Sequence, residues 1–424
     1  MKLGKKGMAA EAGTAVRLFS VYYFVIMLIH LFTNLGGQLI DTSRTLYVQS
    51  LGGSASFAGS MLTITAVAAT VTRLLSGRAS DKFGRRIIIL IGLVIFCISA
   101  ISFNVFPVLN ALPFICLARG FGMGMAATTL SAAITDVIPR SRMSEGLGYY
   151  GLTQPLTSSI GPAIVAGLIA IGDFRSIYFI SAGLLFAGSL VMFSCNYEKD
   201  TKFLDRLRAD LSDDEANSPA KTPGKKDDES RGIAAFIEKS AIPCASLNLI
   251  SAIASSANLS FLMAYAFHME IPNPALYYTL SAVCMVVLRV LTGRFAARFK
   301  PVYLIVLGMM FNLVSFTFLL LSQQYTMLFY IAGMSAGIAS GITAPVLQTT
   351  VVRMCPDSRR GAAMSTYMFT LDIGIAIGSY IWGVLVDNYN YSVMYAGCII
   401  CICIAIALAI ILLRKVKPPR PVRR

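Results

Sequence analysis

Long apolar runs separated by short polar segments recur twelve times along the chain. Each run approaches the roughly 20 apolar residues that an α-helix needs to cross the hydrocarbon core of a membrane. The pattern therefore predicts an all-α membrane protein with twelve transmembrane helices. The predicted spans are residues 17–40, 56–78, 86–106, 112–136, 145–171, 174–195, 241–268, 275–297, 301–321, 327–350, 361–386 and 391–413.

One polar segment is much longer than the others. Residues 196–240 contain 11 acidic and 9 basic side chains, together with serine, proline and glycine. Such a composition buries little apolar surface and is typical of a linker. We therefore expect a six-helix bundle over residues 1–195, a cytosolic linker over 196–240, and a second six-helix bundle with a basic tail over 241–424.

The two halves share landmarks at a nearly constant separation. The segment that begins Arg73-Leu-Leu-Ser-Gly has a counterpart that begins Arg289-Val-Leu-Thr-Gly, 216 residues later, and Pro139 has one at Pro356, 217 residues later. Internal repeats of this kind are found in secondary transporters, in which two related bundles enclose a central site. The repeat predicts two pseudo-symmetric bundles.

A short polar stretch between the second and third predicted helices reads Gly77-Arg-Ala-Ser-Asp81-Lys-Phe-Gly84-Arg85-Arg86. It resembles the signature loop of the major facilitator superfamily, Gly-x-x-x-Asp-(Arg/Lys)-x-Gly-Arg-(Arg/Lys), at all six specified positions. The resemblance implies a cytosolic gate, in which the first arginine of the final pair bonds an acid at the end of the fourth helix. An ordinary basic turn is the alternative. The implied gate residues are Gly77, Asp81, Gly84, Arg85, Arg86 and Asp136.

The composition agrees with a polytopic membrane protein. Of the 424 residues, 56% are hydrophobic and 13% are charged, and the mean hydropathy is +0.69, whereas soluble domains are about a quarter charged. The net charge of +15 does not indicate nucleic acid, because 22 Lys and Arg residues lie at ends and turns that we assign to the cytosol. Only Arg44 and Arg175 lie on the opposite side. This bias predicts a multi-pass inner-membrane protein with both termini in the cytosol.

Charged side chains inside the predicted spans are the candidates for proton coupling. Of the ten acidic residues outside the linker, only Asp372 lies in mid-span. A charge there costs about 2.5–3.5 kcal/mol, so this carboxyl carries a proton, forms a structural ion pair or binds substrate. We expect Arg289 to be its partner. Arg119 begins Arg-Gly-Phe-Gly-Met-Gly, which resembles a fourth-helix motif of the superfamily and implies proton transfer; bonding to backbone carbonyls is the alternative.

Polar residues in the first helix form a stripe. His30, Asn34 and Gln38 recur every four residues and so share one helix face. We expect this face to line the substrate cavity, although a histidine satisfied in the protein interior is the alternative for His30 alone. Further candidates for the cavity are Gln154, Asn248, Asn258 and Gln348.

The resemblance as a whole implies a secondary active transporter that works by alternating access. Gly161-Pro162 in the fifth helix partly resembles a motif of the superfamily's antiporters. We therefore expect proton-coupled efflux of a small organic solute by a monomer in contact with membrane lipid. A proton-linked importer of a sugar, organic acid or peptide is the alternative, and a non-transporting receptor or a lipid-handling enzyme is a further one.

Enzyme signatures are missing from the sequence, which has no phosphate-binding loop, His-Glu-x-x-His motif or nucleophile elbow. The nine cysteines lie mostly within predicted spans and lack the spacing of a disulfide framework. We therefore predict neither enzyme activity, nor a cofactor, nor a metal site.

Overall fold

The computed structural model describes residues 20–139, 142–200, 238–295, 299–356 and 359–414. Within these ranges it contains 12 helices that are long and apolar enough to cross a membrane, which confirms the predicted fold class. Most of the predicted linker lies outside the described residues. The domain boundaries drawn from the sequence therefore stay a prediction.

Six membrane-spanning segments precede the linker, and one of them is interrupted. The segment Glu145–Ala170 consists of two helices that meet at Leu152. The helices of this N-terminal half are α1 (Val21–Ser50), α2 (Ala55–Phe83), α3 (Arg85–Val105), α4 (Leu112–Val137), α5 (Met143–Gly151), α6 (Thr153–Ala170) and α7 (Phe174–Ser194).

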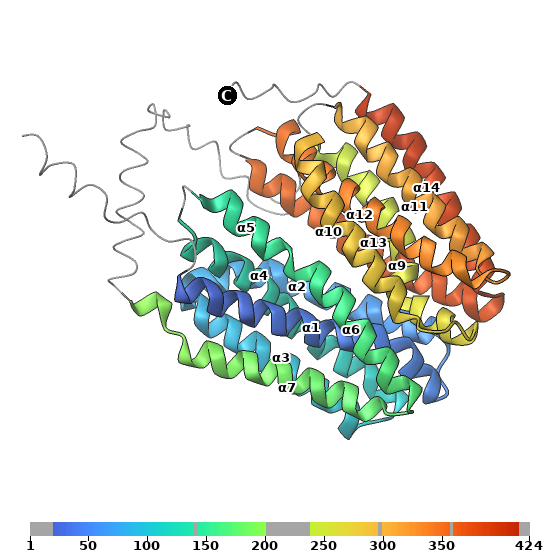
Figure 1. The fold of residues 1–424 in the computed structure, drawn as a ribbon. Coiled ribbons are helices and arrows are strands. Elements are labelled where there is room, and N and C mark those ends of the chain that lie inside the picture. The colour runs from blue at the N-terminus through green and yellow to red at the C-terminus, as the bar shows by residue number, and fades with distance from the viewer. Residues whose placement is uncertain (1–19, 140–141, 201–237, 296–298, 357–358, 415–424) are drawn as a thin grey trace, which may run out of the picture.

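Six spans follow the linker and form the C-terminal half. Figure 1 shows the two halves packed against each other, blue to green below and yellow to red above. Each half has its own apolar core, which includes Phe96 and Leu130 in the first and Phe261 and Phe316 in the second. The helices of the C-terminal half are α9 (Ile242–His268), α10 (Ala275–Phe295), α11 (Pro301–Leu321), α12 (Thr326–Met354), α13 (Arg360–Asn388) and α14 (Tyr391–Leu413).

Glycines allow the helices of each half to approach closely. A Cβ atom on Gly122 of α4 would lie 2.6 Å from the backbone nitrogen of Phe96 in α3. A Cβ atom on Gly341 of α12 would lie 2.8 Å from the carbonyl oxygen of Met285 in α10. Close packing of this kind drives helix association in lipid, where apolar surface alone gives no preference for protein over acyl chain.

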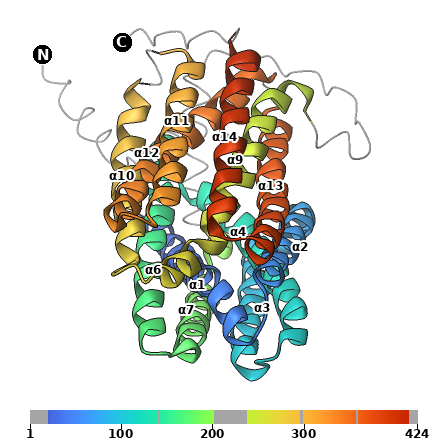
Figure 2. The same ribbon diagram turned by 90° about the vertical axis from the view of Figure 1, so that its right-hand side faces the viewer.

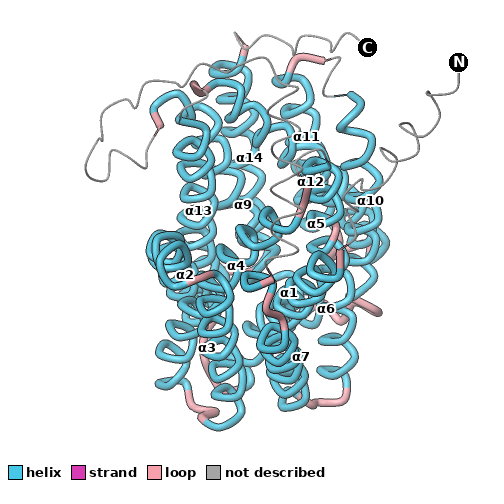
Figure 3. The backbone as a smooth tube through the Cα atoms, turned by 90° about the vertical axis from the view of Figure 1, so that its left-hand side faces the viewer, coloured by secondary structure: helices cyan, strands magenta, loops and turns pink. Residues whose placement is uncertain are grey.

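The two halves meet through three helix pairs, α2 with α13, α1 with α9, and α6 with α10. Asp387 at the end of α13 accepts hydrogen bonds from the backbone nitrogens of Ala55 and Ser56 at 2.7 Å each. Thr45 of α1 donates to the carbonyl of Ser260 at 2.5 Å. These contacts lie at the far end of the bundle, which we define as the end opposite the start of α1 and the end of α14. Figures 2 and 3 show the halves stacked in the same way from two further directions.

The structure corrects the end of the first predicted span. The prediction ended at residue 40, whereas α1 continues to Ser50. Asp41 and Arg44, which we placed in the following turn, therefore lie inside a membrane helix. The search for apolar runs missed these turns because their polar side chains are buried among other helices, where polar partners rather than lipid surround them.

Candidate functional site

The carboxylate of Asp372 joins the two halves. It forms an ion pair with Arg73 of α2, and the hydroxyl of Thr70 donates to the same carboxylate oxygen at 3.2 Å. The side chains of Asp372 and Arg73 are 13% and 30% exposed. The expectation that Arg289 is the partner is wrong, because α13 packs against α2, whereas α10, which carries Arg289, packs against α6 and α12.

Arg289 makes a different contact between the halves. Its Nη1 atom donates to the carbonyl oxygen of Gly151, the last residue of α5, at 3.1 Å. Two arginines from related positions in the repeat therefore both cross to the opposite half. One meets a carboxylate and the other a backbone carbonyl.

Arg119 lies in a buried cluster of charges within the N-terminal half. One carboxylate oxygen of Asp41 is 2.8 Å from Arg119, and the other is 2.8 Å from Arg44. Both arginine side chains are 1% exposed, so the single carboxylate offsets two buried cations. Arg119 also lies 3.4 Å from the carbonyl of Gly37.

Sequence reasoning missed Asp41, although one signal was available. Asp41 lies three residues after Gln38 and so continues the polar face that begins at His30 and Asn34. The prediction stopped at the end of the apolar run and did not follow the face beyond it.

The other residues of that face are engaged with the fifth span. The ring of His30 stacks on Tyr150 with centroids 4.0 Å apart, and its Nδ1 atom is 3.0 Å from the Tyr150 hydroxyl. Asn34 donates to the carbonyl of His30 at 2.8 Å. Gln38 packs against Gly161, where a Cβ atom would lie 2.8 Å from its Cγ. That this face contacts substrate stays a prediction.

The remaining candidates for the cavity do not gather at one place. Asn248 is buried and donates to the carbonyl of Tyr367 at 2.9 Å, which ties α9 to α13. The amide nitrogen of Asn258 lies 3.3 Å from the hydroxyl of Tyr277. Gln154 is exposed and Gln348 is partly buried. Their contact with a solute also stays a prediction.

The signature loop forms part of the implied gate. Arg85 pairs with Asp136 at 2.7 Å, as the resemblance implied. Asp81 is exposed and, across the described residues, has no ion-pair partner within 4.0 Å. Instead Glu198, just after α7, accepts from the backbone nitrogen of Arg85 at 2.6 Å. An acid from the start of the linker thus caps α3, which the sequence analysis did not anticipate.

The other gate residues differ in how closely they are held. Gly84 has φ +88°, a conformation that favours glycine, so its place in the turn has a backbone reason. Arg86 donates to Asn196 at 3.2 Å and to the carbonyl of Phe193. A Cβ atom on Gly77 would meet no described atom within 4 Å, so close packing does not require glycine there in this conformation.

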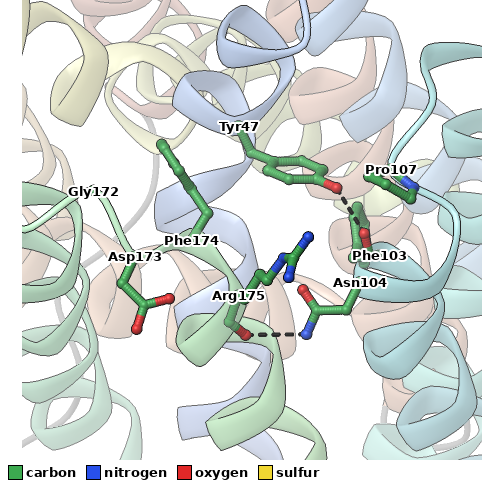
Figure 4. A pocket seen from close by; sticks show the side chains of 8 residues that line it. All are labelled: Tyr47, Phe103, Asn104, Pro107, Gly172, Asp173, Phe174 and Arg175. Atoms are coloured by element: carbon green, nitrogen blue, oxygen red, sulfur yellow. Dashed lines mark hydrogen bonds between the residues drawn. The ribbon is translucent and has the colours of Figure 1, made fainter.

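A cavity of about 270 Å³ lies at the far end, where α1, α3 and α7 meet. Figure 4 shows Arg175, Asn104 and Tyr47 around it. Asn104 donates to the carbonyl of Arg175 at 3.0 Å. Asp173 caps α7 here, and the hydrogen bonds from Ser176 lower the pKa of Asp173. None of the predicted site residues lines this cavity.

The amino-acid sequence is similar to known transporters. An uncharacterized MFS-type transporter of Methanocaldococcus jannaschii is 22% identical over 381 residues, which cover 88% of this chain and 93% of that protein. Quinolone resistance protein NorA of Staphylococcus aureus is 26% identical over 193 residues, which cover 45% of this chain and 49% of NorA.

The fold is similar to solved transporter structures. A POT family transporter in complex with 5-aminolevulinic acid matches with a TM-score of 0.73 and 13% identity, over 92% of this chain and 95% of that one. The nucleoside transporter NupG matches with a TM-score of 0.68 and 12% identity, over 92% and 99%. The sequence profile of the Major Facilitator Superfamily matches residues 14–236 and 241–424. Because this match covers both halves, the chain belongs to the Major Facilitator Superfamily of membrane transporters.

Proposed function

We propose that this transporter exports a small organic solute in exchange for protons, and that Asp372 carries the proton. The observation that carries the proposal is the ion pair between Asp372 of one half and Arg73 of the other. A carboxylate in the middle of a span is costly unless it is paired. It therefore has two stable conditions, charged beside the arginine or protonated and neutral.

Protonation acts directly on the contact between the halves. A neutral Asp372 no longer attracts Arg73, so the contact between α2 and α13 is weakened and the halves separate more easily there. Loss of the proton restores the attraction. Exchange of protons thereby biases the two conformations that alternating access requires.

Arg119 enters the proposal through Asp41. Their pair lies inside the N-terminal half, on the helix face that continues from His30 and Gln38. We assign this face to the solute pathway and the buried pair to holding α1 and α4 in position beside it. Residues assigned to solute contact are His30, Asn34, Gln38, Gln154, Asn258 and Gln348, with Asn248 supporting the cavity wall.

Export is favoured over import by the name of one relative. NorA is a quinolone resistance protein and is similar to about half of this chain. The distribution of Lys and Arg along the sequence supports an inner-membrane protein with cytosolic termini and a cytosolic gate at the signature loop. In that orientation the contacts at the far end close the outer side, which corresponds to an inward-facing conformation.

The test uses inside-out membrane vesicles that are acidified inside and exposed to a panel of small solutes. Solute accumulation together with release of protons from the lumen is expected for export, and Asp372→Asn should abolish both. Glu270→Gln is the matched control, because Glu270 is an exposed acid between α9 and α10. Solute release driven by the same gradient would instead identify an importer, and a wild-type rate in Asp372→Asn would contradict the assigned role of Asp372.

A further inference from the structure

A second seam between the halves contains a pocket of about 380 Å³. It lies where α5 gives way to α6 and opposite α10, and Leu147, Tyr149 and Gly151 line it from one half, Arg289 and Val290 from the other. Pockets for small molecules span roughly 300–1,000 Å³. The volume therefore suits a small ligand that touches both halves.

The position of Arg289 in this pocket has a backbone cause. The carbonyl of Gly151 would normally accept from the backbone nitrogen four residues later, but that residue is Pro155, which has no N–H. The carbonyl is thereby left without its helical partner, and Nη1 of Arg289 donates to it at 3.1 Å. One guanidinium N–H replaces the missing helical bond and ties α10 to the break in the fifth span.

The same guanidinium has unused capacity for an anion. Arginine has five N–H donors in a planar fork that matches carboxylate and phosphate oxygens. Within the described parts of the chain, no carboxylate lies within 4.0 Å of Arg289. Glu145 also lines the pocket, but it pairs with Arg142 at 2.8 Å. The pocket therefore presents one cation that no acid neutralises.

The rest of the pocket wall is apolar and open on its outer side. Val290 is 60% exposed and Leu147 is 39% exposed. In a membrane span such side chains contact acyl chains. A ligand that fits has an acidic head group at the guanidinium and a hydrocarbon portion along these side chains.

We propose that this pocket binds the carboxylate or phosphate group of an amphiphilic anion through Arg289. Binding competes with the carbonyl of Gly151 for the guanidinium, so the ligand loosens the tie between α10 and the fifth span. The proposal deepens the proposed function and rests on it, because it names amphiphilic anions as the substrate class.

The test measures binding to the purified full-length protein in phosphatidylcholine nanodiscs by calorimetry, with dodecanoate, dodecyl phosphate, dodecanol and dodecyltrimethylammonium as probes. Both anions should bind at least about tenfold more tightly than the neutral and cationic probes, since hydrogen bonds to charged groups are the stronger kind. Arg289→Gln should remove this preference, and Arg353→Gln, at an exposed arginine in the last turn of α12, should keep it. Equal binding of dodecanol and dodecanoate, or unchanged anion binding in Arg289→Gln, would overturn the proposal.

Two further variants keep the test decisive if Arg289→Gln does not fold. Val290→Trp fills the pocket from its exposed side and should abolish dodecanoate binding with the charge intact. Pro155→Ala gives the carbonyl of Gly151 a helical donor, which frees Arg289 and should tighten binding. Wild-type affinity in both variants would contradict the assigned pocket.

Adding phosphatidylglycerol to the nanodiscs distinguishes the two sources of the anion. Competition with dodecanoate in the wild type, and none in Arg289→Gln, identifies an anionic membrane lipid as the occupant, whereas no competition identifies a free amphiphile. Asp372→Asn should bind dodecanoate normally at constant pH. Failure of proton coupling in that variant's transport assay therefore tests the proposed function separately from the pocket.

Discussion

Replacing Asp372 with asparagine removes the charge that joins α13 to α2 and preserves the size of the side chain. Breaking a fully buried ion pair costs about 3–5 kcal/mol, whereas an exposed pair contributes at most about 1 kcal/mol. Asp372 and Arg73 are 13% and 30% exposed, so an intermediate loss of roughly 2 kcal/mol is expected. Since 1.4 kcal/mol is a factor of ten, the population with the halves joined here should fall about 30-fold relative to the separated one.

The assay measures the distance between spin labels at Val108 and Tyr325, exposed residues at the far end of the N-terminal and C-terminal halves. The native cysteines are first replaced. Asp372→Asn should shift the distances toward longer values at neutral pH, and acidification should shift the wild type in the same direction. Glu270→Gln should keep the wild-type distribution. A distribution in Asp372→Asn that matches the wild type at every pH would refute the reasoning.

A double-mutant cycle then isolates the pair itself. Arg73→Gln alone should produce a shift of the same sign, and the double variant should show much less than the sum of the two shifts, because the second change removes a partner already lost. Simple additivity would mean that each residue acts through other contacts.

Three further predictions concern stability. Asp41→Asn leaves Arg44 and Arg119 buried without a carboxylate, so we expect a loss of about 3–5 kcal/mol, seen as a lower Tm in thermal unfolding. Gly84→Ala forces a side chain into φ +88°, at about 1–3 kcal/mol, and should speed proteolysis at the turn between α2 and α3. Hydrogen bonds from Ser240 lower the pKa of Glu238 below its ordinary 4.5, so Glu238 stabilises the fold above that pH and the contribution is lost as the pH falls through its lowered value. Glu238→Gln should flatten this part of the pH dependence of unfolding.

The fold was predictable because length and apolarity are hard requirements of a membrane span. Eleven of the twelve spans lie close to the predicted ranges. The end of α1 was not predictable by the same rule, since Asp41 and Arg44 break the apolar run. A helix may carry such residues through the membrane only when other helices supply their partners, and that depends on packing that a run of letters does not contain.

The partner of Asp372 was missed for a reason that lies in the repeat. Arg73 and Arg289 occupy related positions 216 residues apart, so their local sequences gave no reason to prefer one. The choice is made by the arrangement of helices, which sets α2 beside α13 and α10 beside α6. The pair Arg85 and Asp136 was found correctly because a recognised motif already encodes its geometry.

The same repeat explains why the two seams differ in chemistry. Shifting Asp372 by the 217-residue repeat reaches Pro155, so the position of the acid at one seam is that of a proline at the other. Arg73 therefore meets a carboxylate, whose charge depends on pH, while Arg289 meets the carbonyl that the proline frees, whose acceptor strength does not. A proton loosens only the first seam, and an added anion competes at the second. Two related arginines thereby give the halves separate responses to the driving ion and to the solute, as coupled exchange requires.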